Sequence, residues 1–140
     1  MFKNILVPTD LSDKSLKALD IAAGIVEKEN SRVTLLHVVE TIEDDDGEEE
    51  FQFFYEKLAS RAQKKMEEMS NKYINSDFHI RNEIIYGRRV QEIVAYATDK
   101  NIDIIILSSH KLEDIDTAHG WATISYQVGI LSPCPVMMVK

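Results

Sequence analysis

Residues 103–107 read Asp-Ile-Ile-Ile-Leu, a short apolar and β-branched run. Apolar runs of this length, without an alternating polar face, are typical of strands covered on both faces of a parallel sheet. Four further runs predict strands at residues 4–8, 33–39, 80–86 and 135–139. The run at 80–86 is more mixed because it carries Arg81 and Asn82, so we expect this strand at an edge of the sheet.

Helical spacing fills the intervals between these runs, where apolar residues recur every three or four positions. The four patterns comprise Leu16, Leu19, Ala23 and Val26; Phe51, Phe54, Leu58, Ala62, Met66, Met69 and Tyr73; Val90, Ile93, Val94 and Ala97; and Ile124, Val128 and Leu131. We expect Asp10, Ser12 and Asp13 to cap the first helix. The alternation predicts one α/β domain over residues 1–140, a doubly wound five-stranded parallel sheet of strand order 3-2-1-4-5 with helices on both faces.

Composition limits the classes of partner. The 140 residues carry 24 acids and 16 bases, a net charge of −8. Eight of the acids lie in residues 40–50, which contain no base, so the rest of the chain is balanced and offers no basic face for nucleic acid. Apolar runs stay far below the ~18 residues that cross a bilayer. With one cysteine, Cys134, and no signal peptide, we expect a cytoplasmic protein without disulfides.

Ligands of a doubly wound sheet bind beyond the carboxyl ends of the strands, where the strand order reverses. The loops of interest therefore follow the first strand (residues 9–12), the second (from Glu40) and the fourth (residues 108–120). Asp10 follows the first strand directly. Its carboxylate can accept hydrogen bonds from a ribose, a base or a metal-bound water, or it can brace the loop and cap the helix. The sequence leaves both roles open.

Four segments together resemble the universal stress protein family over essentially the whole chain. They are Ile-Leu-Val-Pro-Thr-Asp at 5–10, Leu-Leu-His-Val-Val at 35–39, Asp-Ile-Ile-Ile-Leu-Ser-Ser-His at 103–110, and Pro-Cys-Pro-Val at 133–136. The resemblance implies the sheet described above and a homodimer. Many members hold ATP, which implies binding roles for Pro8, Asp10 and Val38.

The glycine-rich phosphate loop of ATP-binding members is altered in this chain. Its three glycine positions correspond to Ser108, Lys111 and Ala122, and its hydroxyl position corresponds to Thr123. Ten residues rather than nine separate Lys111 from Ala122. Glycines let backbone N–H groups approach phosphate oxygens closely, so their loss weakens the cradle. Lys111 can obstruct the phosphate space or supply a compensating charge, and Thr123 can favour an anion at the fourth helix or merely cap it.

Two functions follow from these features. The first is a dimeric interaction module without the family's ATP site, which pairs through the C-terminal edge strand at Val136 and Met138 and offers the acidic segment 40–50 to a protein partner. The alternative is a switch that binds ATP or AMP with Mg²⁺. No catalytic constellation and no metal-ligand spacing is present, so we expect no enzyme and no resident metal.

The remaining candidate residues have structural interpretations. We expect His37 to be a satisfied histidine in or near the core, His79 to be solvated and Cys134 to be a packing residue. His110 and His119 bracket the loop after the fourth strand without a supporting pattern. One face of the sheet cannot cover all three consecutive aromatic side chains Phe53, Phe54 and Tyr55. We therefore expect part of this aromatic surface to be available to a partner.

Overall fold

The computed structural model describes residues 1–41, 49–109 and 121–140. Its strands are β1 (Asn4–Pro8), β2 (Arg32–Glu40), β3 (His79–Gly87), β4 (Ile104–Ser108) and β5 (Val136–Val139). Its helices are α1 (Lys14–Ile25), α2 (Glu49–Ser70), α3 (Arg89–Asp99) and α4 (Trp121–Leu131), and a 3-10 turn, Asn71–Tyr73, follows α2. Every strand pair is parallel and the order is β3-β2-β1-β4-β5, which confirms the predicted fold class and topology.

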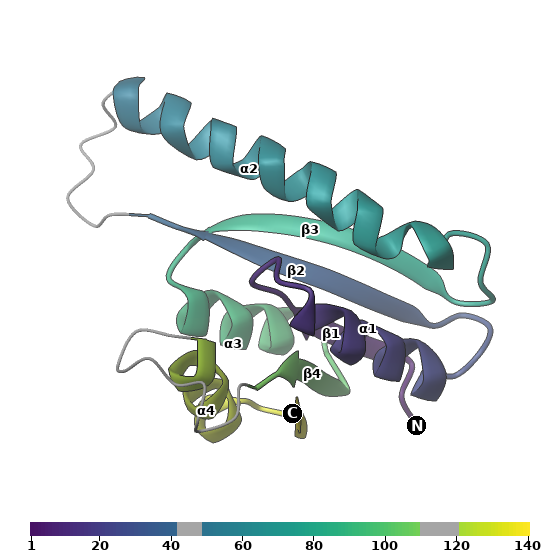
Figure 1. The fold of residues 1–140 in the computed structure, drawn as a ribbon. Coiled ribbons are helices and arrows are strands. Elements are labelled where there is room, and N and C mark those ends of the chain that lie inside the picture. The colour runs from purple at the N-terminus through teal and green to yellow at the C-terminus, as the bar shows by residue number, and fades with distance from the viewer. Residues whose placement is uncertain (42–48, 110–120) are drawn as a thin grey trace.

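Helices cover both faces of the sheet, with α1 and α2 on one face and α3 and α4 on the other (Figure 1). Each side therefore has its own core, formed by alternate residues of the strands. The α1/α2 core includes Ile5, Val7, Leu19, Val33, Leu35, Met66, Ile104 and Ile106. The α3/α4 core includes Leu6, Leu36, Val38, Ile93, Ile105, Leu107 and Val128. The strands are apolar throughout because both of their faces are buried.

The two edges of the sheet differ in chemistry. At β3, the Arg81 Nε atom lies 2.7 Å from the Glu83 carboxylate, and Asn82 Nδ2 donates to Ser70 Oγ over 3.0 Å. The strand order, with β3 at one end of the sheet, confirms the edge position predicted for this strand. The opposite edge, β5, is apolar, and its Met137 side chain is 37% exposed.

One capping expectation is wrong. Asp13 occupies the N-cap of α1, but its side chain makes no capping hydrogen bond. At α1 the local pattern located the helix correctly, but the geometry of the preceding loop decides which side chain reaches the free N–H groups. The helix α4 begins at Trp121, so Thr123 lies within its first turn.

None of the helices in the described ranges combines the length and the apolar character that crossing a bilayer requires.

Candidate functional site

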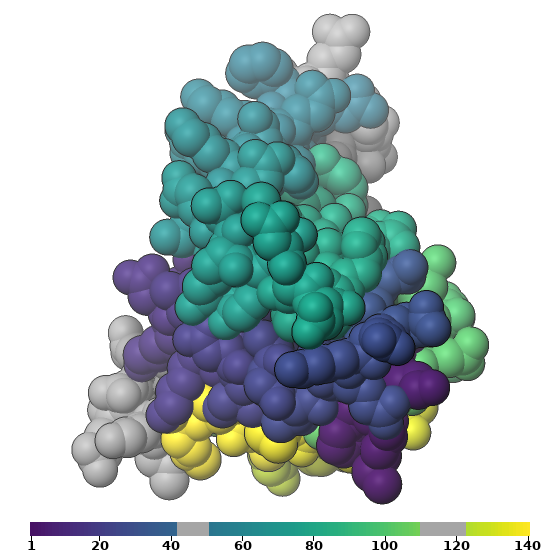
Figure 2. Space-filling view, turned by 90° about the vertical axis from the view of Figure 1, so that its right-hand side faces the viewer, coloured from purple at the N-terminus to yellow at the C-terminus, as the bar shows by residue number. Residues whose placement is uncertain are grey.

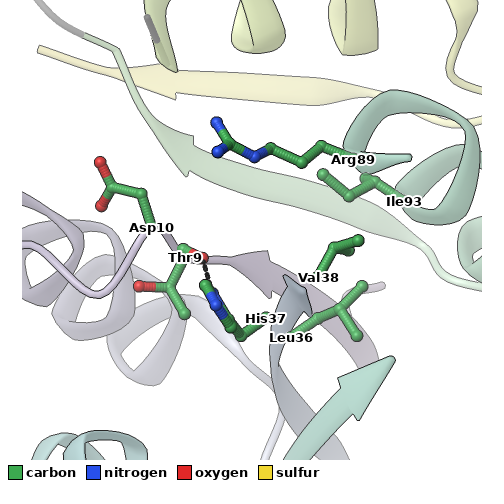
Figure 3. Close-up of a pocket in the computed structure, with 7 residues that line it drawn as sticks. All are labelled: Thr9, Asp10, Leu36, His37, Val38, Arg89 and Ile93. Carbon is green, nitrogen blue, oxygen red and sulfur yellow. Dashed lines mark hydrogen bonds between the residues drawn. The ribbon is translucent and has the colours of Figure 1, made fainter. Parts of the chain in front are cut away.

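A small cavity opens at the carboxyl ends of β1 and β2, beside the point where the strand order reverses. Its volume is about 60 Å³, and Figure 3 shows side chains from the loop after β1, from β2 and from α3 around it. The lining residues are Thr9, Asp10, Leu36, His37, Val38, Arg89 and Ile93. The structure thus brings together Asp10 and Val38, two of the residues singled out by sequence, while the buried Pro8 ends β1 two residues before Asp10.

The carboxylate of Asp10 is engaged within its own loop. Its Oδ1 atom accepts hydrogen bonds from the Ser12 amide at 3.0 Å, the Ser12 hydroxyl at 2.6 Å and the Ser15 hydroxyl at 3.2 Å. Leu11, inside this turn, has a positive φ of 71°. Of the two roles open to Asp10 from the sequence, the structure therefore shows loop bracing directly. The geometry still aims this side chain at the cavity.

His37 forms a wall of the cavity and is tied to β1. Its Nδ1 atom lies 2.9 Å from the carbonyl oxygen of Thr9. Because a carbonyl only accepts, Nδ1 carries the proton and Nε2 is left as an acceptor. Burial lowers the pKa of His37, and Arg89 lowers it further, although the bond to Thr9 and the charge of Asp10 act in the opposite direction. His37 is therefore the satisfied, near-core histidine that we expected.

Arg89 supplies a cationic group to the same cavity. It is the first residue of α3, and its side chain extends toward the loop that carries Asp10 (Figure 3). Its Nε atom lies 3.4 Å from the Glu40 carboxylate at the end of β2. Sequence analysis missed both Arg89 and the position of His37 in this wall. The available signals were the place of His37 directly before Val38 and that of Arg89 directly after the carboxyl end of a strand.

The phosphate side of the predicted nucleotide site is described only in part. Ser108 ends β4 and is buried, and its hydroxyl oxygen has no hydrogen-bond partner among the residues that the structure describes. Thr123 is half-buried in the first turn of α4. The expectations for Lys111, and for His110 and His119, fall outside the described residues.

The cavity alone is too small for a nucleotide. Pockets for small molecules usually span roughly 300–1,000 Å³, whereas this cavity measures about 60 Å³. It can hold a few atoms of a ligand between an apolar wall, Leu36, Val38 and Ile93, and a polar wall that offers Asp10, His37 and Arg89. Within the described ranges, no cluster of three or more His, Cys, Asp or Glu side chains is placed to hold a metal ion.

Comparison with known proteins agrees with this fold. Universal stress protein MJ0577 of Methanocaldococcus jannaschii is 31% identical over 126 residues, covering 79% of this chain and 78% of that protein. Its solved structure superposes with a TM-score of 0.83, covering 100% of this chain and 96% of that one. UspA of Lactobacillus plantarum, at 25% identity, gives a TM-score of 0.81 with 99% and 98% covered.

A more distant solved structure is that of an Arabidopsis thaliana universal stress protein family member with AMP bound. It is 17% identical, with a TM-score of 0.68 and coverage of 99% of this chain and 91% of that one, a likeness of fold. The sequence model of the universal stress protein family matches residues 1–140. This chain therefore belongs to the universal stress protein family.

Proposed function

We propose that this protein is a dimeric, non-enzymatic interaction module of the universal stress protein family. The observation that supports the proposal is the position of β5 at the end of the sheet, where it pairs with β4 alone among the described strands. An edge strand presents a row of backbone donors and acceptors that a second copy can pair with. A twofold axis through such an edge makes a closed dimer, because the same strand serves both partners.

The side chains around β5 suit such an interface. Met137 and Met138 are 37% and 43% exposed, and Ile130 and Leu131 of α4 are 64% and 59% exposed. Helix α4 packs directly on this strand, since a Cβ placed on Gly129 would lie 3.7 Å from the Met138 Cε atom. Met138 therefore lies on the face of β5 that α4 covers, and the neighbouring Met137 lies on the opposite face, so this edge is apolar on both faces and its burial would stabilise a dimer.

Replacement of Met137 by glutamate tests the dimer. The wild-type protein should have the mass of a dimer in light scattering after size-exclusion chromatography, and Met137→Glu should shift it toward the monomer. Phe53→Glu is the matched control, because it removes a 70% exposed apolar side chain from α2, far along the sheet from β5. A monomeric wild type, or a Met137→Glu variant that stays fully dimeric, would refute the interface.

The proposal includes the absence of ATP held in the family's usual manner. Three glycines of the phosphate loop are replaced. The second candidate is a nucleotide-regulated switch, with Pro8, Asp10, Val38 and Thr123 as binding residues and ATP or AMP with Mg²⁺ as ligand. Its support is that Asp10, Val38 and Arg89 border one cavity and that a protein of the same fold has AMP bound. AMP carries one phosphate rather than three, so it needs fewer contacts from the altered phosphate loop than ATP does.

Nucleotide release and calorimetry separate the two candidates. The purified protein is denatured and its supernatant analysed for ATP and AMP, and the nucleotide-free protein is titrated with each nucleotide with and without Mg²⁺. The interaction module predicts no stoichiometric release and no ATP binding. If a nucleotide binds, Asp10→Ala should weaken the binding and Glu48→Ala should not. Lys111→Gly should tighten the binding if the lysine obstructs the phosphate space, and weaken it if the lysine contacts the phosphate.

We also propose that the acidic segment 40–50 receives a basic region of a protein partner. Residues 42–48 of this segment lie outside the described residues, but Phe53 and Phe54 follow it closely in the sequence and are 70% and 53% exposed, so apolar side chains are available to the same partner. Partner capture at two salt concentrations checks the role of the acidic segment. It compares the intact chain with a chain in which the acids at 43–46 are replaced by serine and asparagine. Partner capture that is equal for both chains would contradict it.

A further inference from the structure

The amino ends of the strands, opposite the crevice, form a second and larger pocket. Its volume is about 410 Å³, and its lining residues are Lys3, Asn4, Asn30, Ser31, Arg32 and His79. Figure 2 looks onto this end, where the chain start in purple, the α1–β2 connection in blue and the α2–β3 connection in teal lie close together. Every lining side chain can donate a hydrogen bond, and two of the six are permanently cationic at neutral pH.

The parallel register places three of these residues in one row. Asn4 of β1 stands opposite Arg32 of β2, and Arg32 stands opposite His79 of β3. Residues in register on neighbouring strands point to the same face and lie about 5 Å apart. The next row inward on this face is Leu6, Thr34 and Arg81, of which Leu6 belongs to the α3/α4 core. The sheet therefore fixes the backbone positions of the row, while the exposed side chains keep their rotamer freedom until they bind.

Two donor groups of this row have no local partner. Neither the Arg32 guanidinium nor the His79 ring pairs with a carboxylate or makes a side-chain hydrogen bond among the described residues. Arg32 and His79 are both exposed, so their donors face solvent. The other permanent cation of the pocket, Lys3, has only a long contact, its Nζ atom lying 4.0 Å from the Glu27 carboxylate.

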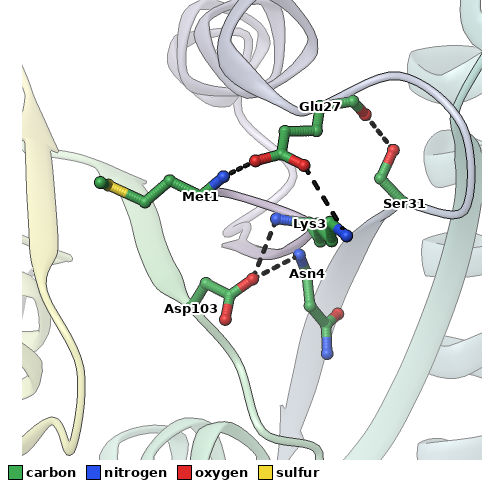
Figure 4. Close-up of polar contacts among 6 residues, drawn as sticks. All are labelled: Met1, Lys3, Asn4, Glu27, Ser31 and Asp103. Carbon is green, nitrogen blue, oxygen red and sulfur yellow. Dashed lines mark hydrogen bonds and ion pairs between the residues drawn. The ribbon is translucent and has the colours of Figure 1, made fainter.

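Three acids at this end of the molecule, Glu27, Asp77 and Asp103, have partners among the described residues, and Figure 4 shows those of Glu27 and Asp103. The Asp103 carboxylate accepts the backbone N–H groups of Lys3 and Asn4, each at 2.9 Å. The Glu27 carboxylate contacts the α-amino group of Met1 as well as Lys3. Asp77 lies 3.9 Å from Lys28. These contacts hold the carboxylates in place as partners of β1 and of the neighbouring loops.

The loop before β2 completes the rim of the pocket. Glu29 and Asn30 adopt positive φ values of 65° and 55°, a conformation that asparagine tolerates better than most residues. The hydroxyl of Ser31 donates to the Glu27 carbonyl, which fixes the loop against the end of α1. Asn30 is thereby held at the pocket, where its side-chain amide adds a neutral donor beside Arg32.

We propose that this pocket binds a small phosphomonoester. A guanidinium matches two phosphate oxygens with its paired N–H donors, and a neighbouring imidazole and ammonium can contact the third oxygen. The net charge of the protein is −8, so its overall field repels an anion and binding must come from these local contacts. A volume of 410 Å³ leaves room for an organic group beyond the phosphate. This inference does not rest on the proposed function, because the pocket lies at the amino ends of the strands and the cavity beside Asp10 lies at their carboxyl ends.

Titration of ¹⁵N-labelled protein with glucose 6-phosphate tests the proposal, with inorganic phosphate in a parallel series at constant ionic strength. We expect saturable shifts of the backbone amides of Lys3, Asn30, Arg32 and His79. Arg32→Ala should raise the dissociation constant tenfold or more, the scale of one lost charge-assisted contact. Tighter binding of the sugar phosphate than of inorganic phosphate places an organic ester in the pocket; the reverse order would restrict the site to the free ion and contradict the proposal.

Two control variants make the result specific. Lys28→Ala removes the same charge from the same end of the molecule without touching the pocket lining, so it should leave the dissociation constant nearly unchanged. Asp10→Ala, at the other end of β1, should also leave it unchanged. Equal losses in Arg32→Ala and Lys28→Ala would show general electrostatic attraction, and unsaturated shifts spread over the surface would show no site; either outcome overturns the proposal.

Discussion

Thr9 and His37 are joined by a hydrogen bond of 2.9 Å between the threonine carbonyl oxygen and the imidazole Nδ1 atom. The amide of the same threonine donates to the Leu36 carbonyl over 2.8 Å. Both backbone groups of Thr9 are thus held by neighbouring residues of β2. The chain therefore leaves β1 in a fixed direction, which sets where the following residue, Asp10, enters the crevice.

Protonation of His37 should destabilise the protein. The pKa of His37 is lowered, mainly by burial, from an ordinary value of 6.5. Between the lowered value and pH 6.5 the unfolded chain therefore binds more protons than the folded one, so this contribution to stability is complete above pH 6.5 and is lost as the pH falls. Urea unfolding at pH 7.5 and pH 5.5 should show a smaller decrease for His37→Asn, which keeps a donor near Thr9 but does not titrate. An unchanged pH dependence would contradict this assignment.

Removal of the Asp10 side chain should loosen the loop after β1. Its Oδ1 atom accepts three hydrogen bonds from Ser12 and Ser15, and Ser15 is fully buried. Asp10→Ala leaves these donors without their acceptor, so we expect a loss of about 1–3 kcal/mol in the free energy of unfolding. Asp10→Asn keeps an acceptor oxygen and should lose less. If Asp10→Ala unfolds at the wild-type urea concentration, the carboxylate has no bracing role.

Gly87 should not tolerate a side chain. Its φ is +149°, and a Cβ there would lie 2.6 Å from Oε1 and 2.7 Å from Cγ of Glu92. Gly87→Ala should therefore lower the free energy of unfolding by about 1–3 kcal/mol. In the double variant with Glu92→Ala the steric part is relieved, while the cost of the backbone conformation stays. Additive effects of the two substitutions would show that Glu92 does not oppose the new methyl group.

Asn82 offers a way to stabilise the protein. Its Oδ1 atom is buried and has no hydrogen-bond partner within the described part of the chain, while its Nδ2 atom donates to Ser70 Oγ over 3.0 Å. Ser70 keeps its own bond to the Met66 carbonyl, at 2.9 Å, when Asn82 is replaced. Asn82→Leu, of similar shape, removes the unsatisfied acceptor and should raise the free energy of unfolding by about 0.5–2 kcal/mol. Asn82→Asp, which places a charge there, should lower it; a reversed order would refute the argument.

Strand and helix positions were predictable because burial on both faces leaves a direct imprint on the sequence. The run Asp103–Leu107 and the structural strand Ile104–Ser108 differ by one residue at each end. Helix caps were less predictable, as Asp13 shows, because several polar residues near a helix start can reach the same N–H groups. Of the candidate site, Asp10 and Val38 were identified, while Arg89 was not, since an arginine at a helix start has many possible roles in isolation.

The sequence by itself determined the alternation of strands and helices, the covering of the sheet on both faces and the concentration of acids in residues 40–50. Only the tertiary structure decided which polar groups meet: His37 and Arg89 around the cavity with Asp10, and Asn4, Arg32 and His79 in one row at the opposite end. The physical reason is that hydrophobic periodicity records burial, a property of each residue with its near neighbours. Contacts between polar groups depend instead on the register of strands far apart in the chain, which no local pattern records.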